Sequence, residues 1–208
     1  GLLRALERAT GLTKWVKDYD SVFSSPLAVH SSIIYAAAED GQLRAIRAED
    51  GQSLWSVELG AVSKARVVVD REELFLGSES GLLYCLRLDG GRKWTFQAKD
   101  AVRGAVTVSG KMVYFGDSSG YVYALERSSG RLVWRVRTGA AVETAPNLIG
   151  DLLYVASFDN FVYAYDAKTG DRRWLVNTLG RLSYDMMAER DGLLLAPQSS
   201  SRLYTLSL

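Results

Sequence analysis

Cysteine and histidine are almost absent from this sequence of 208 residues, which contains one of each, Cys85 and His30. A single cysteine excludes an internal disulfide framework. A lone histidine makes no zinc site without cysteine or carboxylate partners, and the spacing of the other residues supplies no Ser-His-Asp constellation for it. We therefore interpret His30 as a surface or turn residue, and we expect no metal site and no catalytic centre.

The sequence also lacks an excess of either charge, because 25 basic residues balance 24 acidic ones. This balance gives no general attraction to nucleic acid or to an anionic membrane. No stretch reaches the roughly 20 apolar residues of a membrane span, so we expect neither nucleic-acid binding nor direct membrane insertion. There is no signal-peptide pattern and no initiating methionine, which is typical of a mature or excised piece.

What the sequence does contain is one motif written several times. "GYVYALERSSGRLVW" ends at Trp134, and "NFVYAYDAKTGDRRW" ends at Trp174. All five tryptophans fall in such a motif, with spacings of 40, 39, 40 and 40 residues: Trp15, Trp55, Trp94, Trp134 and Trp174. A truncated copy, "SRLYTLSL", closes the chain. A fixed period of about 40 residues indicates a repeat architecture. We expect one repeat domain over residues 1–208, with repeats starting near 1, 41, 81, 120, 160 and 201.

Each repeat reads as four short β-strands. In the fourth repeat, "YVYALER", "RLVWRVR" and "DLLYVAS" alternate or are rich in strand-forming residues, and "TGAAVETAPNLIG" supplies two turns with a short strand between them. Turn residues recur every 8–12 positions, and no helical periodicity appears. Four strands in about 40 residues is the unit of a β-propeller blade. The sequence therefore predicts an all-β propeller.

Two further features of the motif have structural interpretations. A glycine lies four residues before each tryptophan, which indicates a turn that needs a positive φ: Gly11, Gly51, Gly90, Gly130 and Gly170. A tryptophan repeated once per blade fills the gap between neighbouring blades, with its N–H bonded to a nearby backbone group. We therefore expect these ten residues to serve the framework.

These motifs resemble the PQQ-like repeat family, the blades first known from quinoprotein dehydrogenases. The family pattern is a strand ending in Gly-x-x-Tyr-Ala-Leu-Asp, a Thr-Gly turn, and a tryptophan three or four residues later. Five copies match it along the whole chain. Propellers of the WD type fit less well, because their tryptophan is followed by aspartate and none is here.

The resemblance also implies what an enzyme of this family would need. Quinoprotein dehydrogenases hold PQQ with calcium, and they carry adjacent cysteines, an aspartate base, and Glu, Asn and Asp ligands for the metal. Here Cys85 is alone, in a strand position where the other repeats have alanine. We therefore expect a small core residue at Cys85, no cofactor and no enzymatic activity.

Non-enzymatic members of the family include BamB-like envelope scaffolds and extracytoplasmic sensor domains of kinases. The resemblance therefore implies a non-catalytic protein-interaction scaffold with a protein or peptide partner, in the periplasm or elsewhere outside the cytoplasm. Two alternatives stay open. The chain could be a fragment of a PQQ-dependent dehydrogenase whose catalytic loops lie in other blades, or it could be a small-molecule or sugar sensor.

One segment of the repeat varies while the framework is kept. The segments expected to begin the innermost strand are "SVFSSP", "AVSKAR", "AVRGAV", "AVETAP" and "RLSYDM". Repeat proteins often bind through positions that differ between copies on a rigid frame. We therefore predict a partner-binding surface at six of these residues: Lys64, Arg66, Arg103, Glu143, Tyr184 and Asp185. Arg103 and Glu143 occupy equivalent places in adjacent repeats, so we expect them to pair; alternatively, the segment only fills the channel.

The number of blades is open from the sequence. The chain begins with the two outer strands of a blade and ends with the three inner ones. These pieces could combine to close a five-bladed ring. Alternatively, the chain is part of a seven- or eight-bladed ring, whose open edges would invite self-association. We favour the larger ring.

Overall fold

The chain folds into β-strands joined by turns and loops. The computed structural model describes residues 1–181, 185–189, 192–195 and 204–207. These residues form 21 strands and no helix, which confirms the predicted all-β fold. In this described part, accordingly, no helix is long and apolar enough to cross a membrane.

Four complete blades make up the middle of the chain, each an antiparallel sheet of four strands in sequence order. Blade 1 contains β3 (Ala28–His30), β4 (Ile33–Ala37), β5 (Gln42–Arg47) and β6 (Ser53–Glu58). Blade 2 contains β7 (Val68–Asp70), β8 (Glu73–Gly77), β9 (Leu82–Arg87) and β10 (Arg92–Gln97). Blade 3 contains β11 (Thr107–Ser109), β12 (Met112–Gly116), β13 (Tyr121–Glu126) and β14 (Leu132–Arg137). Blade 4 contains β15 (Asn147–Ile149), β16 (Leu152–Ala156), β17 (Phe161–Asp166) and β18 (Arg172–Asn177).

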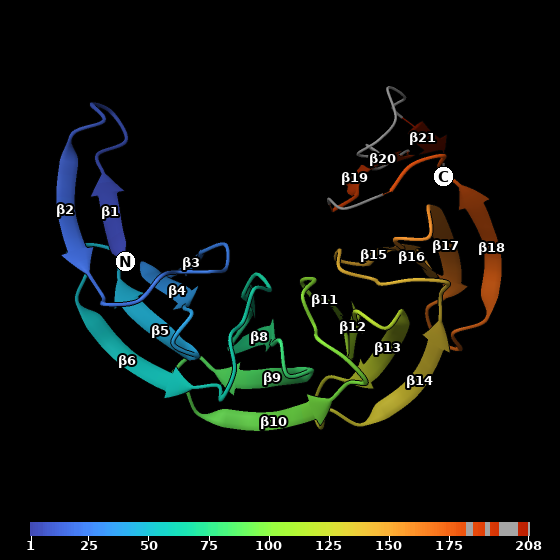
Figure 1. Cartoon of the computed structure of the whole chain (residues 1–208), viewed down its shortest axis with the longest axis horizontal. Coiled ribbons are helices and arrows are strands. Elements are labelled where there is room, and N and C mark those ends of the chain that lie inside the picture. Colours follow the sequence, from blue (N-terminus) through green and yellow to red (C-terminus); the bar gives the residue numbers. More distant parts are fainter. Residues whose placement is uncertain (182–184, 190–191, 196–203, 208) are drawn as a thin grey trace.

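A smaller sheet lies at each end of the arc that the blades form (Figure 1). At one end β1 (Leu2–Leu6) pairs with β2 (Thr13–Asp18). At the other, β19 (Met187–Glu189), β20 (Gly192–Leu195) and β21 (Tyr204–Ser207) form a three-stranded sheet. Among the described residues β2 pairs with β1 and not with β21, so the strand pairing that would close a five-bladed ring is not seen here. The four middle blades are of the predicted propeller type.

The core lies between successive blades. Strands β8, β9, β12 and β13 are almost wholly buried, and apolar side chains of blade 2 pack against those of blade 3. Phe115 stacks on Tyr123 with ring centroids 4.8 Å apart, and Phe96 of the preceding blade meets Tyr123 edge-on at 5.5 Å. Because each blade buries its faces against its neighbours, the array is rigid enough to hold its loops in fixed positions.

Each tryptophan of the motif reaches the next blade. Four indole N–H groups donate to a backbone carbonyl 33 residues further on, in the pairs Trp15–Ala48, Trp55–Leu88, Trp94–Arg127 and Trp134–Ala167. The five motif glycines all have a positive φ, between 70° and 87°. Four of these glycines also lie directly under the tryptophan of the preceding blade or hairpin. The tryptophans and glycines of the repeat motif thus supply the contacts that join each blade to the next.

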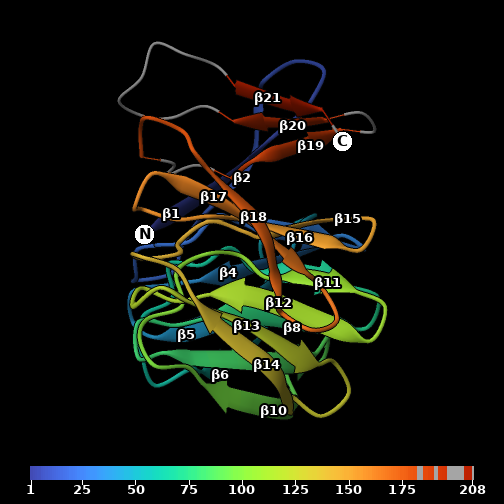
Figure 2. The ribbon, with the colours of Figure 1, turned by 90° about the vertical axis from the view of Figure 1, so that its right-hand side faces the viewer.

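The strand connections lie on two opposite faces of the arc, as the turned view shows (Figure 2). Since consecutive strands are antiparallel, the turns between second and third strands share a face with the loops that lead into the next blade. We call this the mouth face. The turns between first and second strands, and between third and fourth strands, lie on the other face, which we call the base face.

Candidate functional site

Arg103 is the centre of a polar cluster on the mouth face that joins three blades. It precedes β11 of blade 3, and its Nε and Nη2 donate to both carboxylate oxygens of Glu79 in blade 2, at 2.7 to 3.1 Å. Its Nη1 donates to Oε1 of Glu143 in the loop before β15, at 2.8 Å. The pairing of Arg103 with Glu143 that the repeat alignment predicts is therefore present.

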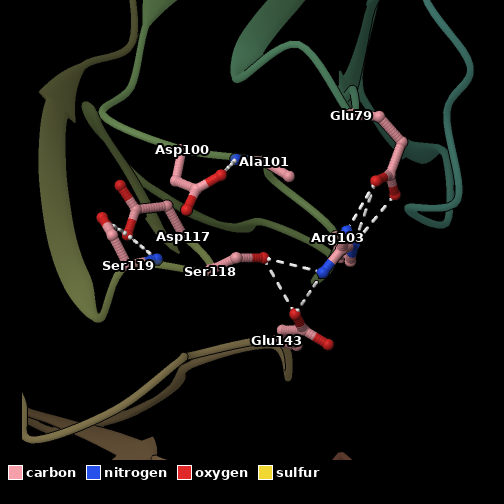
Figure 3. Close-up of polar contacts among 8 residues, drawn as sticks. All are labelled: Glu79, Asp100, Ala101, Arg103, Asp117, Ser118, Ser119 and Glu143. Atoms are coloured by element: carbon pink, nitrogen blue, oxygen red, sulfur yellow. Dashed lines mark hydrogen bonds and ion pairs between the residues drawn. The ribbon is translucent and has the colours of Figure 1, made fainter.

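Ser118 completes this cluster, as the close-up shows (Figure 3). Its hydroxyl donates to Oε1 of Glu143 at 2.8 Å and accepts from Nη1 of Arg103 at 3.2 Å. The Arg103 guanidinium lowers the pKa of Glu79, burial opposes this, and nearby Lys64 lowers it further. The two carboxylates raise the pKa of Arg103. Glu79 is therefore ionised at neutral pH, and both carboxylates are bound by Arg103.

Beside this cluster lies a hollow of about 180 Å³. Segments before the first strands of several successive sheets contribute to its lining, with Pro26, Lys64, Arg66, Arg103, Gly104, Ala105, Glu143 and Asp185. These segments are far apart in the sequence, and the arc brings them together at the inner end of the mouth face. Five of the six predicted binding residues therefore line one hollow.

Arg66 and Asp185 form a second, more exposed pair at this hollow. Nη2 of Arg66 lies 3.5 Å from Oδ2 of Asp185, and about half of each side chain is exposed. Oδ1 of Asp185 also accepts the backbone N–H of Ala145 at 2.8 Å. Exposed pairs of this kind contribute little stability, so they are free to exchange for contacts with another molecule.

The sixth predicted residue, Tyr184, lies outside the described residues. Two other residues of the variable segment serve the framework. Phe23 packs against Tyr19 at 5.4 Å and bridges Ala38, and the buried Ser63 donates to the carbonyl of Gly77 at 2.6 Å. The variable segment thus contains residues that line the hollow and residues that belong to the framework.

The predicted location of the variable segment was wrong in one respect. It does not begin the innermost strand but precedes it, since the innermost strands are only three residues long and β11 begins at Thr107. The backbone there bends against the neighbouring blade, where the N–H of Val102 donates to the carbonyl of Ser78 and that of Val142 to Asp117. A segment that makes these contacts across blades does not continue the ladder of its own sheet.

Glu79 and Ser118 are functional candidates that the repeat alignment missed. Each lies two residues before the turn glycine that begins the third strand, Gly81 and Gly120 respectively. The equivalent residues are Glu39 and Phe158, so this position varies between repeats as the predicted segment does. Phe158 also faces this segment, because the Arg181 guanidinium lies 3.6 Å from its ring centroid. A second position that varies between the aligned repeats therefore identifies these residues.

The cluster does not fit the quinone and calcium of the family's dehydrogenases. The described residues contain no group of three or more His, Cys, Asp or Glu side chains arranged to hold a metal ion. Glu79 and Glu143, the carboxylates at the centre, are both bound by Arg103. Cys85 is fully buried in blade 2. A carboxylate held by a guanidinium is not free to ligate calcium.

Comparison with known families agrees with the repeat pattern. The model of the family described as outer membrane protein assembly factor BamB, a PQQ-repeat family, matches residues 1–93 and 79–208. The chain belongs to this family. No curated protein matches the sequence of this BamB-family chain.

Solved structures share the fold at low sequence identity. BamB from Moraxella catarrhalis aligns with a TM-score of 0.83 and 19% identity over 100% of this chain and 64% of that chain. A chain of the Mitotic Checkpoint Complex aligns at 0.82 and 16%, over 99% and 69%. The quinohemoprotein alcohol dehydrogenase ADHIIG from Pseudomonas putida HK5 aligns at 0.74 and 16%, over 92% and 41%. The BamB-family chain thus spans less than two thirds of the BamB structure.

Proposed function

We propose that this chain is a non-catalytic scaffold that binds a protein or peptide partner through the hollow on the mouth face. The observation that supports this is the position of Lys64, Arg66, Arg103, Glu143 and Asp185. They come from four segments of the repeat array, yet they line one hollow. Variable polar residues gathered on a rigid repeat frame are typical of a recognition surface.

The two parts of the surface have different roles in this proposal. Arg103 is held by Glu79 and Glu143 and gives the surface a fixed shape. Lys64 and Arg66 supply positive charges that are less constrained, since Arg66 is about half exposed and paired at 3.5 Å with the equally exposed Asp185. A partner carboxylate would meet Lys64 and Arg66 first. Tyr184, next to Asp185 in sequence, stays a predicted member of this surface on the sequence alone.

Two observations support a macromolecular partner over the alternatives. Pockets for small molecules usually enclose about 300–1,000 Å³, and the hollow of about 180 Å³ is smaller. The carboxylates at its centre are bound by Arg103, which disfavours a calcium-dependent dehydrogenase. By analogy with the family's description as an outer membrane protein assembly factor, we propose that the partner belongs to an assembly in the cell envelope, outside the cytoplasm.

The experiment compares partner capture by three proteins. The wild type is immobilised beside Lys64→Glu/Arg66→Glu and beside a control, Arg47→Glu/Arg87→Glu, which makes the same change of charge at the base-face ends of strands β5 and β9. We expect a partner that the wild type and the control retain to be lost from the mouth variant. If the mouth variant is folded and retains every partner, the proposal is wrong, and the variable residues only fill the channel.

A second assay addresses catalysis directly. The chain is reconstituted with PQQ and calcium, and dye-linked alcohol oxidation is measured. We expect no turnover above background. Turnover that depends on both additions would overturn the non-catalytic assignment.

A further inference from the structure

The outer strands of blades 2, 3 and 4 carry a band of positive charge. Strands β10, β14 and β18 read "RKWTFQ", "LVWRVR" and "RRWLVN", with six basic side chains and no acidic one. The chain as a whole has a net charge of +1. The remaining residues therefore carry a net −5, because their 19 basic side chains are outnumbered by all 24 acidic ones. We call the exposed face of these three strands the basic rim.

Four arginines of the basic rim form no ion pair among the described residues: Arg92, Arg135, Arg137 and Arg172. Three of them are held against tyrosine rings instead. Arg135 and Arg137 lie 5.0 and 5.3 Å from the ring centroid of Tyr121, and Arg92 lies 5.5 Å from that of Tyr84. A guanidinium placed by an aromatic ring keeps its hydrogen-bond donors for an anion and loses little side-chain entropy on binding.

Strand β14 also has an open backbone edge. It is the last strand of its sheet, and the N–H of Thr138 donates to the carbonyl of Gly120. Antiparallel ladders alternate the direction of their backbone groups. In the register that pairs Arg137 with Tyr121, the backbone groups of Trp134 and Val136 therefore point to β13, and those of Arg135 and Arg137 point outward.

We propose that β14 accepts an acidic, extended peptide segment as an added strand, with carboxylates at alternate positions facing Arg135 and Arg137. Side chains of a strand repeat every second residue on one face, so an alternating acidic segment matches the spacing of the two arginines. Backbone hydrogen bonds would supply affinity and the charges would supply selectivity. This surface is separate from the mouth face.

Other anionic partners fit these features less well. Both arginines of β14 are packed on Tyr121, so its ring is not open for the base stacking that single-stranded nucleic acids use. A membrane surface is flat, and β10, β14 and β18 point in different directions around the convex side of the arc (Figure 1). A flexible peptide chain can follow this convex surface, whereas a flat bilayer cannot.

Protection of an exposed edge is another use of charged side chains. Strand β6 tests that explanation within the same molecule. It has the same edge position in blade 1 and contains no basic residue, since it reads "SLWSVE". If edge protection were the only requirement, β6 would need positive charge equally.

The test uses the whole chain and a fluorescent peptide that alternates glutamate and threonine. We expect the wild type to bind it and the Arg135→Gln/Arg137→Gln variant to bind about tenfold more weakly, because two exposed charge pairs are lost together. The control Arg47→Gln/Arg87→Gln removes the same charge from the ends of strands β5 and β9 and should bind like the wild type. Equal weakening in both variants would overturn the proposal, because net charge alone would then explain binding.

Three further measurements test how the peptide binds and which class of ligand the surface prefers. A peptide that is N-methylated at alternate residues should lose binding, and retained binding would contradict strand addition. Single-stranded DNA of equal charge and vesicles containing phosphatidylglycerol should bind more weakly than the peptide. Tighter binding of either through the same arginines would overturn the assignment. Absence of peptide binding together with self-association of the Arg135→Gln/Arg137→Gln variant would leave edge protection as the role of the charges.

Discussion

The indole Nε1 of Trp94 donates a hydrogen bond of 2.8 Å to the backbone carbonyl of Arg127 in the next blade. The six-membered ring of the same tryptophan lies against Gly130, three residues after that carbonyl. The Trp94 side chain thus contacts the next blade at two points, and these contacts set the position of that blade and its distance from blade 2. Because this joint recurs at each boundary, we expect stability to depend on nearest-neighbour contacts between blades.

The Trp94–Gly130 joint leads to a first prediction. A Cβ at Gly130 would lie 2.6 Å from Cε3 of Trp94, at a φ of +70°. We expect Gly130→Ala to lower the free energy of unfolding by about 2–4 kcal/mol, from backbone strain and overpacking together. Gly110→Ala is the matched control, because Gly110 has a φ of +55° and open space around it. It should lose only about 1–2 kcal/mol. Equal losses in urea unfolding would show that the tryptophan contact is unimportant.

A second prediction concerns the pH dependence of the Arg103 cluster. Arg103 lowers the pKa of Glu79 below its usual value of 4.5. The pairing therefore stabilises the fold fully above that pH, and its contribution is lost as the pH falls through the lowered pKa. We expect Glu79→Gln to cost about 1 kcal/mol at neutral pH, a value that allows for solvent screening, and progressively less in acid. Glu39→Gln, at the equivalent position of blade 1 where the described residues form no ion pair, is the control and should cost less at neutral pH. A pH-independent cost at Glu79 would contradict this account.

A third prediction concerns a charged cluster on the base face, between blades 2 and 3. The carboxylate of Glu73 is paired with Lys93 and with Arg127, which also binds Asp70. Burial raises the pKa of Glu73, but the hydrogen bonds from Lys93 and Arg127 outweigh it, so the net pKa lies below its usual value. The side chains of Glu73 and Arg127 are 9% and 11% exposed. We expect Glu73→Met to cost about 3 kcal/mol, because it leaves the largely buried Arg127 with one acidic partner, Asp70.

The repeat supplies the control for that change. The neighbouring blade has Met112 at the position of Glu73, and Leu88 occupies the position of Arg127 one repeat earlier. The double variant Glu73→Met/Arg127→Leu should therefore recover most of the stability in chemical denaturation. A double variant as unstable as the single one would show that the charges do more than replace an apolar contact.

A fourth prediction concerns Cys85. Burial, and to a lesser extent the charge of Glu73, raise the pKa of its thiol to about 12. The reactive thiolate is therefore scarce at neutral pH. We expect a thiol reagent to label the native chain only as fast as the chain unfolds, whereas the denatured chain reacts at once. Rapid labelling of the native chain would contradict the described burial. Cys85→Ala should fold normally, because four other repeats carry alanine there.

Much of the fold could be predicted from the sequence, because the residues that define the framework lie close together within each repeat and recur in every copy. The tryptophan period determined the blades, and the glycines before each tryptophan identified turns that the structure shows at positive φ. The pairing of Arg103 with Glu143 followed from the same alignment, since equivalent positions in adjacent blades lie side by side. Each of these inferences needs only the sequence period and the stereochemistry of one residue type.

The partners of those residues depended on contacts between segments far apart in the chain. Arg103 binds Glu79 as well as Glu143, and Arg66 approaches Asp185, because the arc turns loops of different blades toward one point. The variable segment precedes the innermost strand because its backbone bonds to the neighbouring blade, which a single-repeat pattern does not reveal. The sequence alone determined which positions differ between the repeats and which positions keep the same residue. The tertiary structure decided which of them meet, because the curvature of the array sets the distances between loops.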